Sequence, residues 1–132
     1  MTIAAKALTE DRAIGPAEED GGHRPVDLVH LARYTMGNRD LEREVLTLFA
    51  RQSDIYVARL REARDAKAWV EAAHTLKGSA RGIGAWRVAD AAERAERRAA
   101  EAGSAGCRKV ADAVSERVAE ANRFIEDLLA SA

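Results

Sequence analysis

The stretch CRKVADAVSERVAEANRFIEDLL, residues 107–129, has the clearest helical pattern in the chain. Small and aliphatic residues recur along it at alternating steps of four and three: Cys107, Ala111, Val114, Val118, Ala121, Ile125 and Leu128. Residues at this spacing lie on one face of an α-helix, and an apolar face of this length has to pack against other helices. The stretch therefore predicts a helical bundle.

The segments before it supply the other helices. Helical spacing also runs through residues 39–63, 66–81 and 85–102, and a shorter helix is predicted at 26–35 with Asp27 as its N-cap. Glycine-containing breaks separate these segments: MGN at 36–38, Gly82 and Gly84, and GSAG at 103–106. Short connections make neighbouring helices antiparallel. The prediction is an all-α fold, an antiparallel up-down four-helix bundle with a short additional N-terminal helix.

The helix at 39–63 is amphipathic, and the sequence suggests which of its faces is apolar. A row at alternating steps of four and three, flanked by Phe49 and Tyr56, is predicted to form that face. Its members are Leu41, Val45, Leu48, Gln52, Ile55, Arg59 and Ala63.

Composition excludes several classes of protein. The 132 residues indicate one domain, with 1–24, rich in glycine, proline and acids, as a flexible tail and 25–132 as the bundle. Net charge is −1, with 21 basic and 22 acidic side chains, which gives no field to attract nucleic acid or an anionic membrane. No apolar run approaches the roughly 20 residues of a membrane span, and no signal peptide is evident. With Cys107 as the single cysteine, we expect a cytoplasmic protein.

The helix predicted around His74 places this residue opposite its apolar face. With Leu76 at the centre of that face, His74 falls about 160° away at roughly 100° per residue. The apolar face also holds Trp69, Ala72, Ala73, Ala80 and Ile83. The outer side shared with His74 holds Lys67, Val70, Glu71, Lys77, Gly78 and Arg81.

These surroundings suit an imidazole that accepts a phosphoryl group. Neutral imidazole is a nucleophile. The ammonium of Lys77 would stabilise charge on the group being transferred. Gly78, one turn after His74, has no side chain and leaves room for a partner to approach the ring, although glycine costs about 1 kcal/mol against alanine within a helix.

The segment AHTLKGSARGIGA, residues 73–85, resembles the signature of histidine-containing phosphotransfer (HPt) domains. That signature is a His-x-x-Lys-Gly core followed by small residues and a later glycine. The matching positions here are His74, Lys77, Gly78, Ser79 and Gly84. The preceding VDLVHLARYTMGNRDLEREVLTLF also looks like the family's opening helices, and the resemblance covers roughly residues 25–130. Arg81 departs from the pattern, because the family often has a small or neutral residue there.

The resemblance implies a phosphorelay intermediate. His74 would accept a phosphoryl group from an aspartyl phosphate of a receiver domain and pass it to, or drain it from, another receiver aspartate, with Lys77 as charged neighbour and Gly78 as the clearance position. Response-regulator receiver domains and a hybrid sensor histidine kinase are the implied partners. Mg²⁺ is expected on the receiver, and no cofactor or metal in this chain. Contacts with the partner are predicted at Val70, Glu71, Arg81 and Lys67, and the chain is expected to be a monomer.

Other interpretations of the same residues are weaker. Glu71 and His74 have the Glu-x-x-His spacing of di-iron bundles, but that site needs a second copy and two further glutamates, all pointing inward. No nucleotide-binding motif appears, so we expect no autonomous kinase activity. The alternative left open is a helical adaptor that binds a receiver or another signalling partner without being phosphorylated. Cys107, Trp69 and Trp86 are interpreted as packing residues, and His23 and His30 as having no role.

Overall fold

The computed structural model describes residues 24–131, and the regular secondary structure in this range is all helical, without strands. The helices are α3 (Leu28–Thr35), α4 (Arg39–Glu62), α5 (Ala66–Ile83), α6 (Trp86–Arg97), the 3-10 turn η1 (Ala99–Glu101) and α7 (Cys107–Ser131). None of these helices has an apolar run long enough to cross a membrane. The predicted tail lies outside the described residues, apart from Arg24, and so does His23.

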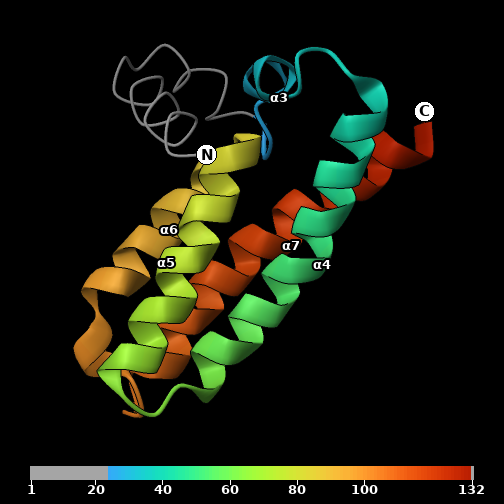
Figure 1. The fold of residues 1–132 in the computed structure, drawn as a ribbon. Helices are drawn as coiled ribbons and strands as arrows, with labels where there is room; N and C mark the ends of the chain where they lie inside the picture. Colours follow the sequence, from blue (N-terminus) through green and yellow to red (C-terminus); the bar gives the residue numbers. More distant parts are fainter. Residues whose placement is uncertain (1–23, 132) are drawn as a thin grey trace.

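Helices α4, α5, α6 and α7 form an antiparallel bundle, and the short α3 lies at one end of it (Figure 1). In this bundle α4 packs against α5 and α7, and α6 packs against the same two helices. At the end opposite the α4–α5 connection, the first turn of α4 lies beside the last turns of α7, where the Arg43 guanidinium donates to the Leu129 carbonyl at 3.5 Å. The predicted all-helical bundle is confirmed.

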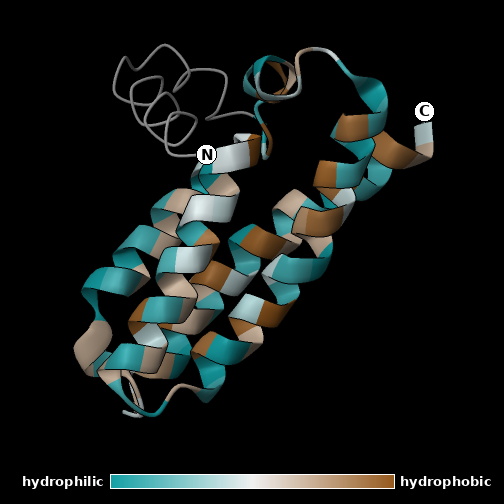
Figure 2. Cartoon of the chain, viewed as in Figure 1, coloured by the Kyte–Doolittle hydropathy of each residue, from teal (hydrophilic) through white to brown (hydrophobic). Residues whose placement is uncertain are grey.

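Two of the predicted apolar faces form the core. On α7 the buried residues are Ala111, Val114, Val118, Ala121 and Ile125, while Cys107 and Leu128 at the ends of the row are partly covered. On α5 they are Trp69, Ala72, Ala73, Leu76, Ala80 and Ile83. Hydrophobic and hydrophilic residues alternate along both helices at helical spacing (Figure 2). Local periodicity therefore identified the buried side of these helices correctly.

The predicted face of α4 is wrong. Its buried residues are Leu46, Phe49, Ser53, Val57 and Leu60, whereas Leu41, Leu48 and Ile55 of the predicted row are exposed. Apolar residues occur at helical spacing on both sides of this helix, so spacing alone does not choose between them. The choice comes from contacts with the neighbouring helices: for example, the Asn122 side-chain amide on α7 donates to the Ser53 hydroxyl at 3.2 Å.

Capping side chains fix where the helices begin. The carboxylate of Asp27 accepts from the His30 N–H at 3.1 Å, and that of Asp65 accepts from the Ala68 N–H at 2.8 Å. Each bond satisfies an N–H that has no partner within its helix. The side chain of Asn38 caps α4 in the same way, accepting from the Leu41 N–H at 2.9 Å.

Helix ends differ from the prediction at two places. Gly82 lies inside α5, which continues to Ile83 and ends at Gly84 in the left-handed region with φ 79°. Helix α6 stops at Arg97, well before residue 102, and the chain continues through η1.

A buried contact between Asp27 and Trp86 fixes α3 to the α5–α6 turn. The indole N–H of Trp86 donates to the Asp27 carboxylate at 3.0 Å, and the Asp27 N–H donates to the Gly84 carbonyl at 2.9 Å. A Cβ on Gly84 would lie 2.9 Å from the Cβ of Asp27, so only glycine fits at this contact. The ring of His30 is buried and meets Trp86 edge-on, with 4.9 Å between ring centroids. Both residues therefore serve packing at this end of the bundle.

Candidate functional site

His74 lies in the middle of α5 on the outer face of the bundle. Its side chain is 67 % exposed, as its position opposite Leu76 predicts. One turn later, Gly78 is exposed as well, and a Cβ built on it would have no neighbouring heavy atom within 4 Å. The chain therefore presents an imidazole in the middle of a helix, with free space on the side of the following turn.

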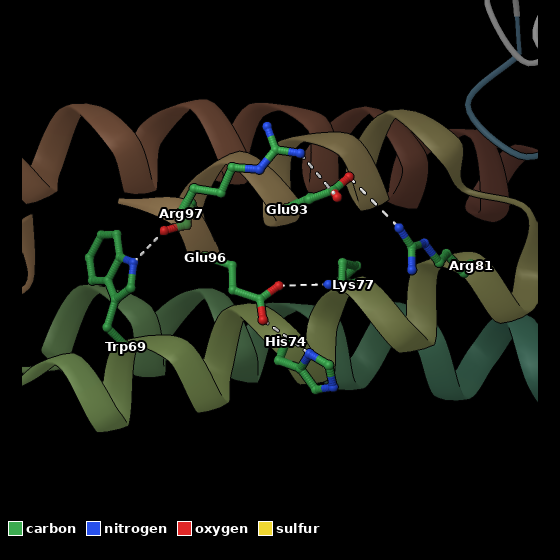
Figure 3. Close-up of polar contacts among 8 residues, drawn as sticks. Trp69, His74, Lys77, Arg81, Glu93, Glu96 and Arg97 are labelled. Carbon is green, nitrogen blue, oxygen red and sulfur yellow. Dashed lines mark hydrogen bonds and ion pairs between the residues drawn. The ribbon is translucent and has the colours of Figure 1, made fainter. Parts of the chain in front are cut away.

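A carboxylate on α6 holds the His74 ring. The Glu96 Oε2 lies 3.1 Å from the His74 Nδ1, and the Oε1 of the same carboxylate accepts from the Lys77 ammonium at 2.7 Å (Figure 3). Lys77 lies along this contact with only 14 % of its side chain exposed. It is thus paired with α6, and does not stand free beside the gap that Gly78 leaves.

The two cationic partners stabilise the ionised form of Glu96. The hydrogen bond from Lys77 has the largest effect and lowers the pKa of the Glu96 carboxyl below the ordinary value of 4.5; the Lys77 charge and the His74 contact act in the same direction. An ionised carboxylate only accepts hydrogen bonds. The ring nitrogen facing Glu96 therefore carries a proton, and the lone pair of the neutral ring lies on Nε2, which points away from Glu96 (Figure 3).

We expect Glu96→Gln to lower stability at neutral pH and to lose that effect in acid. Because folding lowers the Glu96 pKa, the stabilisation is present above the unfolded value of 4.5 and disappears as pH falls through the lower folded value. We expect a difference of about 1 kcal/mol or less, since the pair is partly solvated. Urea unfolding of both proteins, at pH 7 and at several values below 4.5, measures it. A difference that stays constant down to pH 2 would contradict this assignment.

The last turn of α6 is tied to α5 next to Glu96. The indole N–H of Trp69, which is fully buried, donates to the carbonyl of Ala95 at 2.6 Å (Figure 3). Ala95 directly precedes Glu96, so this bond fixes the height of the Glu96 turn relative to α5. Trp69 is thus a core residue, as predicted, and it also helps to set the distance between Glu96 and His74.

A second charged contact joins α5 and α6 one turn further along α5, where Glu93 on α6 contacts two arginines. The Arg81 guanidinium lies 3.7 Å from one oxygen of Glu93, and Arg97 reaches the other oxygen at 3.2 Å (Figure 3). Arg81 is 22 % exposed, so α6 covers much of it. Among the other predicted contact residues, Lys67 and Glu71 are exposed and Val70 is partly buried. All four predicted contact residues lie on α5, and Arg81 is the one held by α6.

Glu96 is the site residue that the sequence analysis missed. One signal was present: Glu93 and Glu96 are three residues apart on one helix, while Lys77 and Arg81 are four apart on the preceding helix. Such spacings put each pair on one side of its helix. Which carboxylate meets which cation depends on the offset between α5 and α6, and that offset follows from packing.

Substitutions at Gly78 are expected to separate folding from function. Gly78→Ala should leave stability unchanged or raise it by up to about 1 kcal/mol, because alanine is the better helix former and the site is open. Gly78→Gln should also fold, but its side chain would stand one turn from the imidazole and slow phosphoryl transfer. Melting temperature and transfer rate measure the two effects. If Gly78→Gln transfers at the wild-type rate, the space beside the imidazole is not needed for transfer. If Gly78→Ala unfolds, Gly78 is a packing residue.

Comparison with known proteins identifies the family. The Hpt domain model matches residues 44–129, a segment that contains His74 on α5 and Glu96 on α6. No curated protein and no solved structure matches the chain. Hpt domains are phosphotransfer modules without kinase activity of their own, and they interact with receiver domains and kinases. Because the match covers well over half of the chain, this protein belongs to the Hpt domain family, whose members carry out histidine phosphotransfer in two-component signalling.

Proposed function

We propose that this chain is a phosphorelay intermediate whose phosphoacceptor is His74. It takes a phosphoryl group from the aspartyl phosphate of one receiver domain and passes it to, or drains it from, the aspartate of another. The observation that carries this proposal is the exposed imidazole whose Nδ1 lies 3.1 Å from the Glu96 carboxylate and whose Nε2 points away from it.

In the proposed reaction, the lone pair on His74 Nε2 attacks the phosphorus of the receiver's acyl phosphate. The N–P bond forms as the P–O bond to the aspartate breaks, and the electron pair of that bond returns to the receiver's carboxylate. The ring gains positive character during the attack. The Glu96 carboxylate at Nδ1 stabilises this charge and keeps the ring oriented, as a carboxylate that accepts from Nδ1 does for other reactive imidazoles. Transfer to the next receiver is the same step in reverse.

Two further residues of the site have separate roles in this proposal. The ammonium of Lys77, held 2.7 Å from Glu96 on the Nδ1 side of the ring, lowers the pKa of that carboxyl and keeps it in place for its contact with His74. Gly78 gives the receiver's acidic pocket room to close over the ring. Mg²⁺ would be bound by that acidic pocket, since Glu93 and Glu96, the carboxylates that α6 brings to this face, are paired with Lys77, Arg81 and Arg97 of the chain itself.

The docking surface proposed for the receiver surrounds His74 on α5. Lys67, Val70 and Glu71 lie before the histidine along this helix, and Arg81 lies after it. The guanidinium of Arg81, held against Glu93, would face acidic groups of the receiver and contribute to the choice of partner. A hybrid sensor histidine kinase is proposed as the source of the phosphoryl group, in the cytoplasm.

The chemistry of the label tests the proposal. The full chain is incubated with each phosphorylated receiver domain of the source organism, and the label on the chain is then exposed to acid and to base. A phosphoramidate on His74 is lost in acid and survives base. Label that survives acid means that another kind of residue carries it. Binding to receivers without any label supports the adaptor alternative instead.

A further inference from the structure

The outer face of α4 carries a row of exposed aliphatic side chains. Five large hydrophobic residues are exposed between residues 24 and 131, and three of them lie on this helix: Leu41 at 39 %, Leu48 at 48 % and Ile55 at 44 %. They are seven residues apart, which lines them up along one face of the helix. Single exposed aliphatic residues are ordinary, but a row at this spacing is the pattern by which helices pair.

Two charged residues lie between these aliphatic residues on the same face. Glu44 stands between Leu41 and Leu48, and Arg51 between Leu48 and Ile55; both are exposed. Within the range that the structure describes, neither side chain has an ion-pair partner. We call the five residues, Leu41, Glu44, Leu48, Arg51 and Ile55, the α4 ridge. Its charges are opposite in sign on the two sides of Leu48.

This order makes the α4 ridge complementary to itself. Leu41 and Ile55 are equally far from Leu48, so a second copy related by a two-fold axis at Leu48 places Leu41 beside the partner's Ile55. The same axis brings Glu44 next to the partner's Arg51, within about one residue's rise of 1.5 Å. Glu44 and Arg51 lie on the same side of the aliphatic row, so a parallel arrangement would leave the charges of the two copies on opposite flanks, where they do not meet. Charge complementarity therefore selects a second copy in the antiparallel orientation.

We propose that the α4 ridge is the interface of a homodimer in which two α4 helices pack antiparallel around Leu48. A two-fold interface of this kind uses the same surface on both chains and closes after two copies. It differs from the expectation of a monomer. The hollow lined by Arg43, Glu44, Thr47, Leu48 and Arg51 lies at the centre of the interface, where it would receive the partner's Leu48.

The α4 ridge and the candidate site lie on different helices. His74 lies on α5 and its ring is held from α6. The proposal does not rest on the phosphorelay function, because it uses none of the residues around His74. Each dimer would carry two copies of the candidate site.

Sedimentation velocity of the full chain over a range of concentrations tests the interface. We expect the mass to rise from that of one chain to that of two, and we expect Leu48→Glu to stay at one chain throughout. Val29→Glu is the matched control, because Val29 is an exposed aliphatic residue on α3, outside the ridge; it should dimerise like the wild type. Circular dichroism shows that each variant is folded. A wild type that remains a single chain at millimolar concentration overturns the proposal.

A charge exchange tests the antiparallel pairing. Glu44→Arg should weaken the dimer at least tenfold, because each copy then sets arginine against arginine, and Arg51→Glu should do so by setting glutamate against glutamate. Combining the two substitutions restores opposite charges at both ends and should restore the dimer. A double variant as weak as the single ones overturns the arrangement. If the wild type is monomeric and Leu48→Glu instead weakens receiver binding, the ridge belongs to the receiver and the homodimer is wrong.

Discussion

His74→Gln is expected to abolish labelling of this chain by phosphorylated receivers, at every receiver that labels the wild type. Glutamine has no nucleophilic nitrogen, because its amide lone pair is delocalised, so no N–P bond can form. The side chain is 67 % exposed and packs against little, and the variant should therefore keep the melting temperature of the wild type. Radioactive transfer from receivers, read on base-stable gels, measures the loss, which we expect to reach the background of the assay.

The control for this prediction is Lys109→Gln. Lys109 is an exposed residue near the start of α7, on a different helix from the candidate site, and its substitution should leave labelling unchanged. Receiver binding by His74→Gln should survive, since the imidazole is one contact among several. Labelling of His74→Gln above background would show that another residue carries the phosphoryl group, and His74 would then not be the phosphoacceptor.

Trp69→Ala is expected to lower the free energy of unfolding more than any other substitution proposed for this protein. The side chain is fully buried between α5 and α6, and truncating a buried tryptophan to alanine costs about 3–5 kcal/mol. A domain of this size has roughly 5–15 kcal/mol of net stability, so the variant would lose a large share of it. Urea denaturation at pH 7, followed by far-ultraviolet circular dichroism, measures the change in the free energy of unfolding.

Trp69→Phe separates the two contributions of the indole. It keeps most of the apolar volume but removes the N–H that donates to the Ala95 carbonyl at 2.6 Å, which should cost about 1–3 kcal/mol. Because Ala95 precedes Glu96, this variant should also slow phosphoryl transfer at temperatures where it is fully folded. If Trp69→Ala is as stable as the wild type, the contact of Trp69 with α6 does not stabilise the bundle. If Trp69→Phe transfers at the wild-type rate, the bond from Trp69 to Ala95 does not affect the candidate site.

The sequence by itself determined the features that depend on local spacing. The apolar row of α7, the buried face of α5 and the exposure of His74 opposite Leu76 all follow from helical periodicity, which a single segment contains in full. The predicted cap at Asp27 is equally local, because its side-chain oxygen meets an N–H three residues later. Gly78 was correctly placed on the open side for the same reason.

Tertiary structure alone decided the features that depend on how helices are placed against each other. Helix α4 has apolar residues on two sides, and packing against α5 and α7 buried the side with Phe49 and left Leu48 exposed. Glu96 meets His74 across 22 residues of sequence because the offset between α5 and α6 brings their side chains to the same height. Such offsets arise from packing of side chains over the whole length of both helices, including the bond from Trp69 to Ala95, so no short pattern in either helix contains them.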